Sequence, residues 1–182
     1  MQKTNKIAFT TRNNAAAATV ATRLGGQAYL DNRDNSDHLP FSALVTVATD
    51  HLSGITQELA PEGIYVICER VIKPGKAGCY GLFPMMRHPD LTHEQSDAHW
   101  RDVHAPLALE HHIHMTHYLQ ICVMTTLHGP ELDGIALCGF ATEDDVRNRF
   151  YTTEEGVKII AADIAKFANL KTSPRRLMAV PA

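Results

Sequence analysis

The chain has 182 residues, 45% of them apolar and 20% charged, which is the ordinary composition of a globular protein. A formal net charge of −3, with no cluster of lysine and arginine, argues against binding to nucleic acid or to an anionic membrane. No run of about 18 apolar residues occurs, and no basic start followed by an apolar stretch, so we expect a soluble cytoplasmic protein.

Hydrophobic periodicity and turn residues predict two successive sets of elements, each in the order strand, helix, strand, strand, helix, strand. The first set is expected at residues 6–11, 14–24, 27–30, 43–49, 51–59 and 63–72. The second set is expected at residues 79–86, 93–109, 114–126, 135–140, 143–167 and 176–180. A linker rich in turn residues, 73–78, separates the two sets.

A short internal similarity supports the interpretation as a repeat. Residues 42–50 align with residues 135–143, with Ala, Leu, Ala and Thr at matching positions. The order βαββαβ is that of ferredoxin-like domains, in which helices cover only one face of an antiparallel sheet. We therefore predict an α+β protein in which two ferredoxin-like repeats close into one intrachain dimeric α+β barrel. Residues 1–75 would be a degenerate scaffold repeat and residues 76–182 the domain with the pocket; alternatively, the first copy is an unrelated appendage.

The segment 87–107 carries the strongest chemical signal. Thr92 and Gln95 form a capping box, which predicts a helix that begins at His93. The inward stripe of this helix would contain Ser96, Trp100, Val103, His104 and Leu107. An imidazole that titrates near neutral pH is thereby placed one turn away from a large apolar ring.

His104 is the candidate general acid or base. Pro106 lacks a backbone N–H and is expected to end the helix, which leaves His104 in the last turn, where the helix dipole favours the imidazolium. A group with a pKa near the working pH suits proton transfer. The alternative is that His104 only packs and hydrogen-bonds a carbonyl group.

The second half of the chain resembles the EthD-like family of dimeric α+β barrel proteins. The resemblance is carried by Arg87 with Pro89, Trp100, His104 and Ala105-Pro106-Leu107. Further matches are Asp133-Gly134-Ile135-Ala136 with Phe140, Tyr118 with Gln120, and Asp163 with Phe167 ahead of Ser173 and Arg175. Two departures, Ser96 where the family usually has Phe and His99 where it usually has Tyr, leave the substrate open.

The resemblance implies one pocket per chain, on the second repeat, because the helix at residues 14–24 has neither the Trp nor the His. We expect His104 to transfer protons and Trp100 to form a stacking wall. Further substrate-binding residues are expected at the pocket and its mouth: His99, Tyr118, Arg87 and Ser96. The implied partner is a small hydrophobic or aromatic organic molecule, for example a lactone or a polyketide-like compound.

The implied chemistry is an isomerase-, cyclase- or decarboxylase-like reaction through an enolate, which one histidine and a neighbouring donor could manage without a cofactor. Two alternatives stay open. One is a non-catalytic accessory or carrier protein for a hydrophobic small molecule in a degradation pathway, and the other is an oxidoreductase of the same superfamily. A homodimer in addition to the internal pseudo-dimer also stays open.

Four histidines follow the predicted helix: His111, His112, His114 and His117. In an extended segment His112 and His114 lie on one side, and with Glu110 they could hold a divalent metal. No familiar spacing such as His-Glu-x-x-His is present, so we expect a solvated loop and no metal site, with a metal-dependent oxidoreductase as the alternative. Haem proteins occur among related barrels, but no residue stands out as an axial ligand.

The four cysteines all fall in predicted strands: Cys68, Cys79, Cys122 and Cys138. They lack the two-residue spacing of zinc and redox motifs, so we expect reduced thiols that are buried as small hydrophobic side chains. The sequence also lacks a Gly-rich phosphate loop and a Gly-x-Ser-x-Gly elbow, which argues against a nucleotide-binding enzyme and a serine hydrolase.

Overall fold

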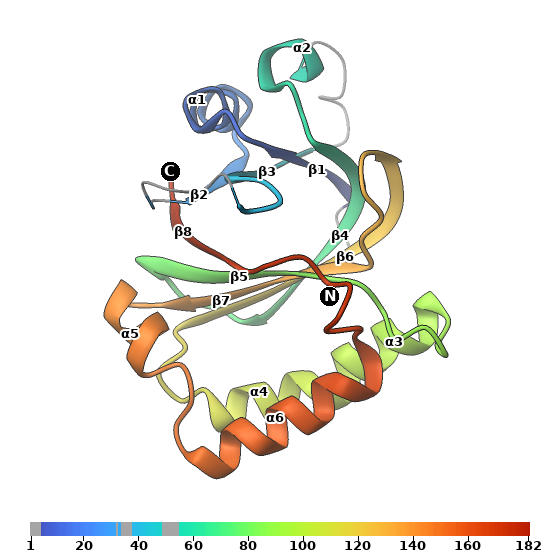
Figure 1. Ribbon diagram of the computed structural model, residues 1–182. Helices are drawn as coiled ribbons and strands as arrows, with labels where there is room; N and C mark the ends of the chain where they lie inside the picture. Colours follow the sequence, from blue (N-terminus) through green and yellow to red (C-terminus); the bar gives the residue numbers. More distant parts are fainter. Residues whose placement is uncertain (1–4, 32, 34–37, 49–54) are drawn as a thin grey trace.

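The computed structural model describes residues 5–31, 33, 38–48 and 55–182. These residues form an α+β protein built on one closed barrel of eight antiparallel strands, with helices on two opposite sides (Figure 1). The elements of the first half are β1 (Asn5–Thr11), α1 (Asn14–Leu24), β2 (Gln27–Asp31), β3 (Ala43–Ala48), α2 (Ile55–Leu59) and β4 (Gly63–Lys73). Those of the second half are β5 (Cys79–Met85), α3 (His93–His99), the π-helical turn η2 (Trp100–His104), α4 (Ala105–His111), β6 (His117–His128), β7 (Gly134–Phe140), α5 (Glu143–Asn148), α6 (Glu154–Phe167) and β8 (Leu177–Pro181).

Hydrogen bonds join neighbouring strands around the barrel in the order β1, β3, β2, β8, β5, β7, β6, β4 and back to β1. Within the first half the order is β4, β1, β3, β2, and within the second half it is β8, β5, β7, β6. Strands with the same rank in the two halves, such as β1 and β5, therefore have the same position in the strand order of their half. Two seams join the halves: β2 pairs with β8 over residues 29–31, and β4 pairs with β6 over residues 64–73.

One hydrophobic core fills the inside of the barrel. All eight strands contribute to it, for example Leu44 and Ile67 from the first half and Leu82, Leu119 and Leu177 from the second. Burial of apolar surface is the main stabilising contribution to folding. Each half-sheet thus depends on the other half to cover its inner face.

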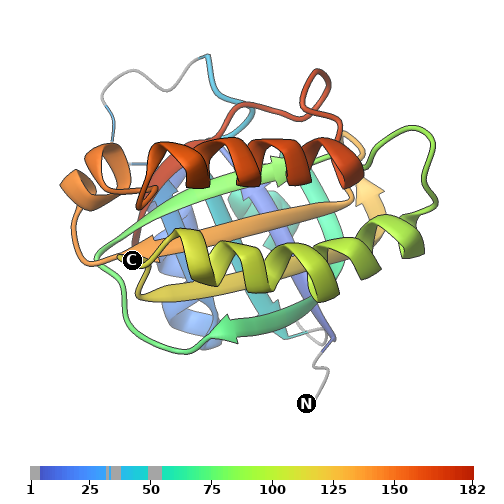
Figure 2. The same cartoon turned by 90° about the horizontal axis from the view of Figure 1, so that it is seen from below.

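Helices cover the outer faces of the two half-sheets. α1 and α2 pack on the first half through small and branched side chains, such as the fully buried Ala17, Val20 and Leu59. On the second half, Figure 2 shows α6 and the helical run α3, η2 and α4 side by side across the strands. No helix in the described part of the chain is both long and apolar enough to cross a membrane.

Most predicted elements are present, with small differences at their ends. The helix predicted at 14–24 has the bounds of α1, whereas the helical region predicted at 143–167 is divided into α5 and α6. The strand start predicted at His114 is wrong: β6 begins at His117, because residues 112–116 form a turn after α4. Residues 49 and 51–54, which belong to two predicted elements of the first half, lie outside the described residues.

The prediction that Pro106 ends the helix is also wrong. Pro106 lies in the first turn of α4, and the helical run continues to His111. A proline is tolerated in the first turn of a helix, where its missing N–H needs no partner. Just before it, the N–H of Ala105 bonds the carbonyl of Trp100 across the wider turn η2, a kind of local widening that is frequent at functional sites. His104 consequently lies in the middle of the helical run, and the dipole argument for a charged imidazole does not apply.

Candidate functional site

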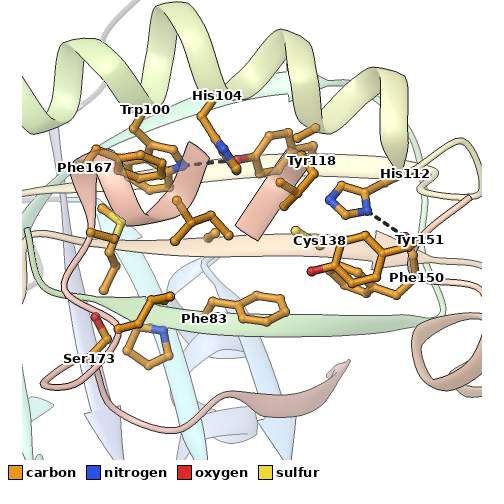
Figure 3. A pocket seen from close by; sticks show the side chains of 18 of the residues that line it. Phe83, Trp100, His104, His112, Tyr118, Cys138, Phe150, Tyr151, Phe167 and Ser173 are labelled. Carbon is orange, nitrogen blue, oxygen red and sulfur yellow. Dashed lines mark hydrogen bonds between the residues drawn. The ribbon is translucent and has the colours of Figure 1, made fainter. Parts of the chain in front are cut away.

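A cavity of about 190 Å³ lies between the second-half helices and the outer face of β5, β6 and β7 (Figure 3). Its walls are mostly apolar and include the rings of Phe83, Phe150 and Phe167. Few of the described side chains that line it carry a nitrogen or oxygen atom: Trp100, His104, His112, Tyr118, Tyr151 and Ser173. An apolar cavity with a small set of polar groups is the usual form of a small-molecule site.

A buried carboxylate on the neighbouring helix holds His104. Nδ1 of His104 lies 3.0 Å from Oδ2 of Asp163 on α6, and Nε2 of His99 lies 2.9 Å from the other oxygen, Oδ1. An ionised Asp163 accepts the Nδ1–H of His104, so the lone pair of His104 is on Nε2. Among the described residues Nε2 has no hydrogen-bond partner, and the ring lines the cavity (Figure 3).

The surroundings set the charges of this pair. Burial lowers the pKa of His104, and the hydrogen bond and charge of Asp163 offset only part of that effect. Burial raises the pKa of Asp163, but hydrogen bonds from His99 and His104 outweigh it, so the net pKa is below its ordinary value. At neutral pH His104 is therefore an uncharged base beside an ionised carboxylate, not the imidazolium expected from the helix dipole.

Tyr118 on β6 presents a hydroxyl group in the same cavity. Its oxygen accepts the indole N–H of Trp100 at 3.1 Å and the amide N–H of Gln120 at 3.2 Å. Because these two bonds use both lone pairs, the hydroxyl hydrogen is left to donate, and no described residue accepts it. Burial raises the pKa of Tyr118, so the hydroxyl keeps its proton. Tyr118 is thus a neutral donor in an apolar cavity.

Two close contacts fix the position of the Trp100 indole. A Cβ added at Gly134 on β7 would come within 2.6 Å of the ring, so only glycine fits beneath it. The guanidinium of Arg70 lies over the ring, 5.6 Å from its centre, held by two hydrogen bonds to Asp97 of 2.6 and 2.7 Å. Arg70 comes from β4, so the first half of the chain supports a wall of the cavity.

His112 is a cavity residue that the sequence reasoning missed. It follows α4 directly, is 3% exposed, and its Nδ1 donates to the carbonyl of Phe150 at 2.6 Å. Burial lowers the pKa of His112 to about 4, so the ring is neutral with its lone pair on Nε2. The signal lay in the helical spacing of Trp100, His104, Ala108 and His112, which share one face only if the helix continues past Pro106.

His114 and His117 of the same segment contact different parts of the molecule. His114 lies 2.8 Å from a guanidinium nitrogen of Arg149, and Nδ1 of His117 lies 2.9 Å from the hydroxyl of Tyr80. In the described part of the chain no three side chains of His, Cys, Asp or Glu group as metal ligands would.

Three of the predicted substrate-binding residues do not line the cavity. Ser96 donates its hydroxyl to the carbonyl of Phe167 at 2.9 Å, and His99 stacks on the Phe167 ring with 5.2 Å between centroids. Both therefore fix α6 against α3 instead of facing a ligand. The guanidinium of Arg87 is half-exposed and pairs with Asp133 at 2.8 Å. His104, Trp100 and Tyr118 are brought together in the cavity wall.

Comparisons with known proteins agree with this architecture. Residues 88–171 match the EthD domain. A solved anthrone oxidase-like protein superposes with a TM-score of 0.59 at 8% identity, over 99% of this chain and 91% of its own. A protein from Lactobacillus acidophilus NCFM, provisionally named a monooxygenase, does so with a TM-score of 0.53 at 8% identity, over 100% of this chain and 94% of its own.

Identities this low show a shared fold and nothing about the reaction. Comparison with curated proteins gives no match. The family match includes the helices, β6 and β7 around the cavity, with Trp100, His104 and Asp163, but not β5. The resemblance predicted from residues 87–107 is thereby confirmed: residues 88–171 of this eight-stranded α+β barrel match the EthD domain.

Proposed function

We propose that this protein is an enzyme that moves a proton on a small, largely apolar substrate, with His104 as the general base. The observation that carries the proposal is the buried hydrogen bond between His104 and Asp163, which leaves Nε2 of His104 as a free basic nitrogen at the cavity. A histidine held in one tautomer by a carboxylate is well suited to accept a proton. The EthD domain and the names of the two fold neighbours agree with a small-molecule enzyme.

The proposed step uses only groups of this chain. A substrate C–H or O–H next to a carbonyl or aromatic ring gives its proton to Nε2 of His104, and the imidazolium that forms is balanced by Asp163. The negative charge left on the substrate oxygen accepts the O–H of Tyr118. Return of the proton from His104 to a different atom completes an isomerisation. In a cyclase-type reaction the enolate carbon first forms a bond to a second carbonyl carbon of the substrate, whose oxygen then takes the proton. In a decarboxylase-type reaction the proton removed is that of a substrate carboxyl group, and carbon dioxide leaves before His104 returns the proton to carbon.

The cavity also indicates the substrate class. Its size of about 190 Å³ and its aromatic walls suit a flat aromatic, polycyclic or lactone ring that packs against Trp100. His112 lies eight residues after His104 on the same helical side, about 12 Å along the axis. Its neutral Nε2 can accept a hydroxyl of the substrate, so we propose a ligand with a second polar group away from the reacting atom.

We also propose that the two halves are ferredoxin-like repeats within one chain, with residues 1–75 as scaffold and 76–182 as the domain with the site. The corresponding strand orders and the βαββαβ order in each half support this. Arg70 of β4 gives the scaffold a direct role, because it packs on the indole that forms the cavity wall.

A second candidate reaction is an oxidation of the deprotonated substrate by molecular oxygen. The fold neighbours named as an anthrone oxidase-like protein and as a monooxygenase favour it. Both candidates begin with the same proton transfer to His104. Oxygen consumption that matches product formation would select the oxidation, and turnover without oxygen would select the isomerase-type reaction.

The test uses a panel of phenolic compounds and lactones, with binding followed by ligand-observed NMR and conversion by mass spectrometry. In the His104→Gln variant we expect turnover to fall about 10²- to 10⁴-fold while ligand binding is retained. The matched control is His128→Gln, at an exposed position at the end of β6, which should turn over as wild type does. Equal turnover in His104→Gln would contradict the proposal, and tight binding without conversion by the wild type would make the protein a carrier.

A further inference from the structure

A second cavity, of about 360 Å³, lies where α3 covers the seam between β4 and β6. The proposed function does not use it. Its lining differs from that of the first cavity, because two thiols, a thioether, an imidazole and several charged groups line it: Cys68, Cys122, Met124, His93, Asp97 and Arg70.

The two thiols face each other across the seam. Cys68 on β4 and Cys122 on β6 are direct partners in the antiparallel register, so their side chains lie on the same face of the sheet. Directly opposed Cβ atoms are about 4.5–5.5 Å apart, and a disulfide needs about 3.5–4.5 Å. Both cysteines are unbonded in this structure. A small approach of the two strands therefore suffices to link them.

A proton acceptor is in place beside Cys122. Its sulfur lies 3.5 Å from Nε2 of His93, and Nδ1 of the same imidazole lies 3.0 Å from Oδ1 of Asp133. With Nδ1–H donating to Asp133, the lone pair on Nε2 faces the thiol. An imidazole held by a carboxylate in this way can take the proton of the thiol when the sulfur attacks.

We propose that Cys68 and Cys122 form a reversible disulfide across the β4–β6 seam, with Cys122 as the attacking thiol and His93 as its proton acceptor. The oxidant is a low-molecular-weight disulfide. Cys122 passes its proton to His93 and attacks one sulfur of the oxidant, which forms a mixed disulfide and releases one thiol. Cys68 then attacks the sulfur of Cys122, loses its proton and releases the second thiol. Two protein thiols are oxidised, and one disulfide is reduced to two thiols.

The surroundings make this exchange slow. Burial and the neighbouring Asp97 raise the pKa of Cys122 to about 12, so little thiolate is present at neutral pH. We expect the reaction to be slower than at an exposed cysteine, and to depend on His93. The linked pair would lie next to Arg70, two residues along β4, whose guanidinium packs on the indole of the first cavity.

The other two cysteines provide an internal control. Cys79 on β5 is opposite Phe140, and Cys138 on β7 is opposite Gly81, so these thiols are two residues out of register. Such diagonal neighbours are about 7–8 Å apart, which is too far for a disulfide without rearrangement of the strands. We expect both to stay reduced when Cys68 and Cys122 are linked.

The test is incubation of the folded wild-type protein with glutathione disulfide, followed by alkylation of free thiols in denaturant, digestion and mass spectrometry. We expect a linked peptide pair that contains Cys68 and Cys122, two hydrogen atoms lighter than the reduced pair, with Cys79 and Cys138 alkylated. Alkylation of all four cysteines after prolonged incubation would overturn the proposal. A linkage that includes Cys79 or Cys138 would overturn it as well.

Variants then test the assigned roles. Cys68→Ala should stop the reaction at a stable glutathione adduct on Cys122, whereas Cys122→Ala should leave Cys68 unmodified. His93→Gln should slow formation of the link several-fold relative to the control His128→Gln. An unchanged rate in His93→Gln, or modification of Cys68 in the absence of Cys122, would contradict these roles. The wild-type mapping needs no variant and decides the link itself.

Discussion

The two helix layers on opposite sides of the barrel differ in what they bury. On the first half, α1 and α2 bury small and branched apolar side chains such as Ala17 and Val20, and they line neither cavity. On the second half, α3 to α4 and α6 bury two imidazoles and a carboxylate around a space of about 190 Å³. Similar scaffolds can therefore carry a packed support layer, α1 with α2, and a layer that we propose to be reactive, α3 to α4 with α6, depending on which side chains the helices direct toward the sheet.

The largest effect that this comparison predicts concerns Asp163. In the Asp163→Asn variant the charge that balances the imidazolium is lost, and the amide no longer enforces the Nδ1–H tautomer of His104. We expect kcat/KM to fall about 10²- to 10⁴-fold. The matched control is Asp144→Asn, an exposed carboxylate on α5, which should leave kcat/KM unchanged. Full activity of the Asp163 variant would mean that the pair with His104 is only structural.

Among the residues of α3 to α4 and α6, Trp100 is the one whose substitution should lower the free energy of unfolding most. Trp100→Ala removes a fully buried ring that packs against Gly134 and Arg70, and we expect a loss of about 3–5 kcal/mol in the free energy of unfolding. Urea unfolding followed by circular dichroism measures it, because the chain has no other tryptophan for fluorescence. A loss below about 1 kcal/mol would indicate that the cavity wall collapses to fill the space.

The reactive layer should also make stability depend on pH. In the unfolded chain a histidine titrates near 6.5, whereas the pKa of His112 in the folded protein is about 4. Between these two values the unfolded state binds more protons, so the contribution of His112 to the free energy of unfolding falls as the pH is lowered through this window and is constant above it. The expected loss is about 3 kcal/mol. His112→Gln should flatten this part of the curve, and an unchanged slope would contradict the buried, neutral imidazole.

The smallest effect is expected in the support layer. Val20→Ala on α1 removes two buried methyl groups, which should lower the free energy of unfolding by about 2 kcal/mol. Turnover at a temperature where the variant is folded should equal that of wild type. A selective loss of activity would show that the first half does more than support the barrel.

Much of this architecture follows from local patterns in the sequence. Alternating and helical periodicities predict the strands and helices. The residues at 87–107, with the further match at Tyr118, indicate an EthD-like second half with His104, Trp100 and Tyr118 as candidate site residues. The elements depend on neighbours within a few turns of the chain, for which local physics is sufficient. The EthD-like assignment and the candidate site residues rest on the family resemblance as well.

The remaining features depend on contacts between distant segments. Asp163 is 59 residues from His104, and only the packing of α6 against the first helical run brings them together. His112 was missed because Pro106 was expected to end the helix, and the wide turn before it depends on tertiary packing. Arg87 was expected at the pocket, but Asp133, just before β7, holds its guanidinium.

The most direct test is the protonation state of the His104 imidazole, measured by ¹⁵N NMR of histidine-labelled protein, with His104→Gln used for assignment. We predict that Nδ1 carries the proton and that Nε2 stays unprotonated at pH values below the ordinary histidine pKa, with a change in the Nε2 signal on ligand binding. A proton on Nε2 in the neutral ring, or titration at or above a pKa of 6.5, would contradict the central claim that His104 is a neutral base held by Asp163.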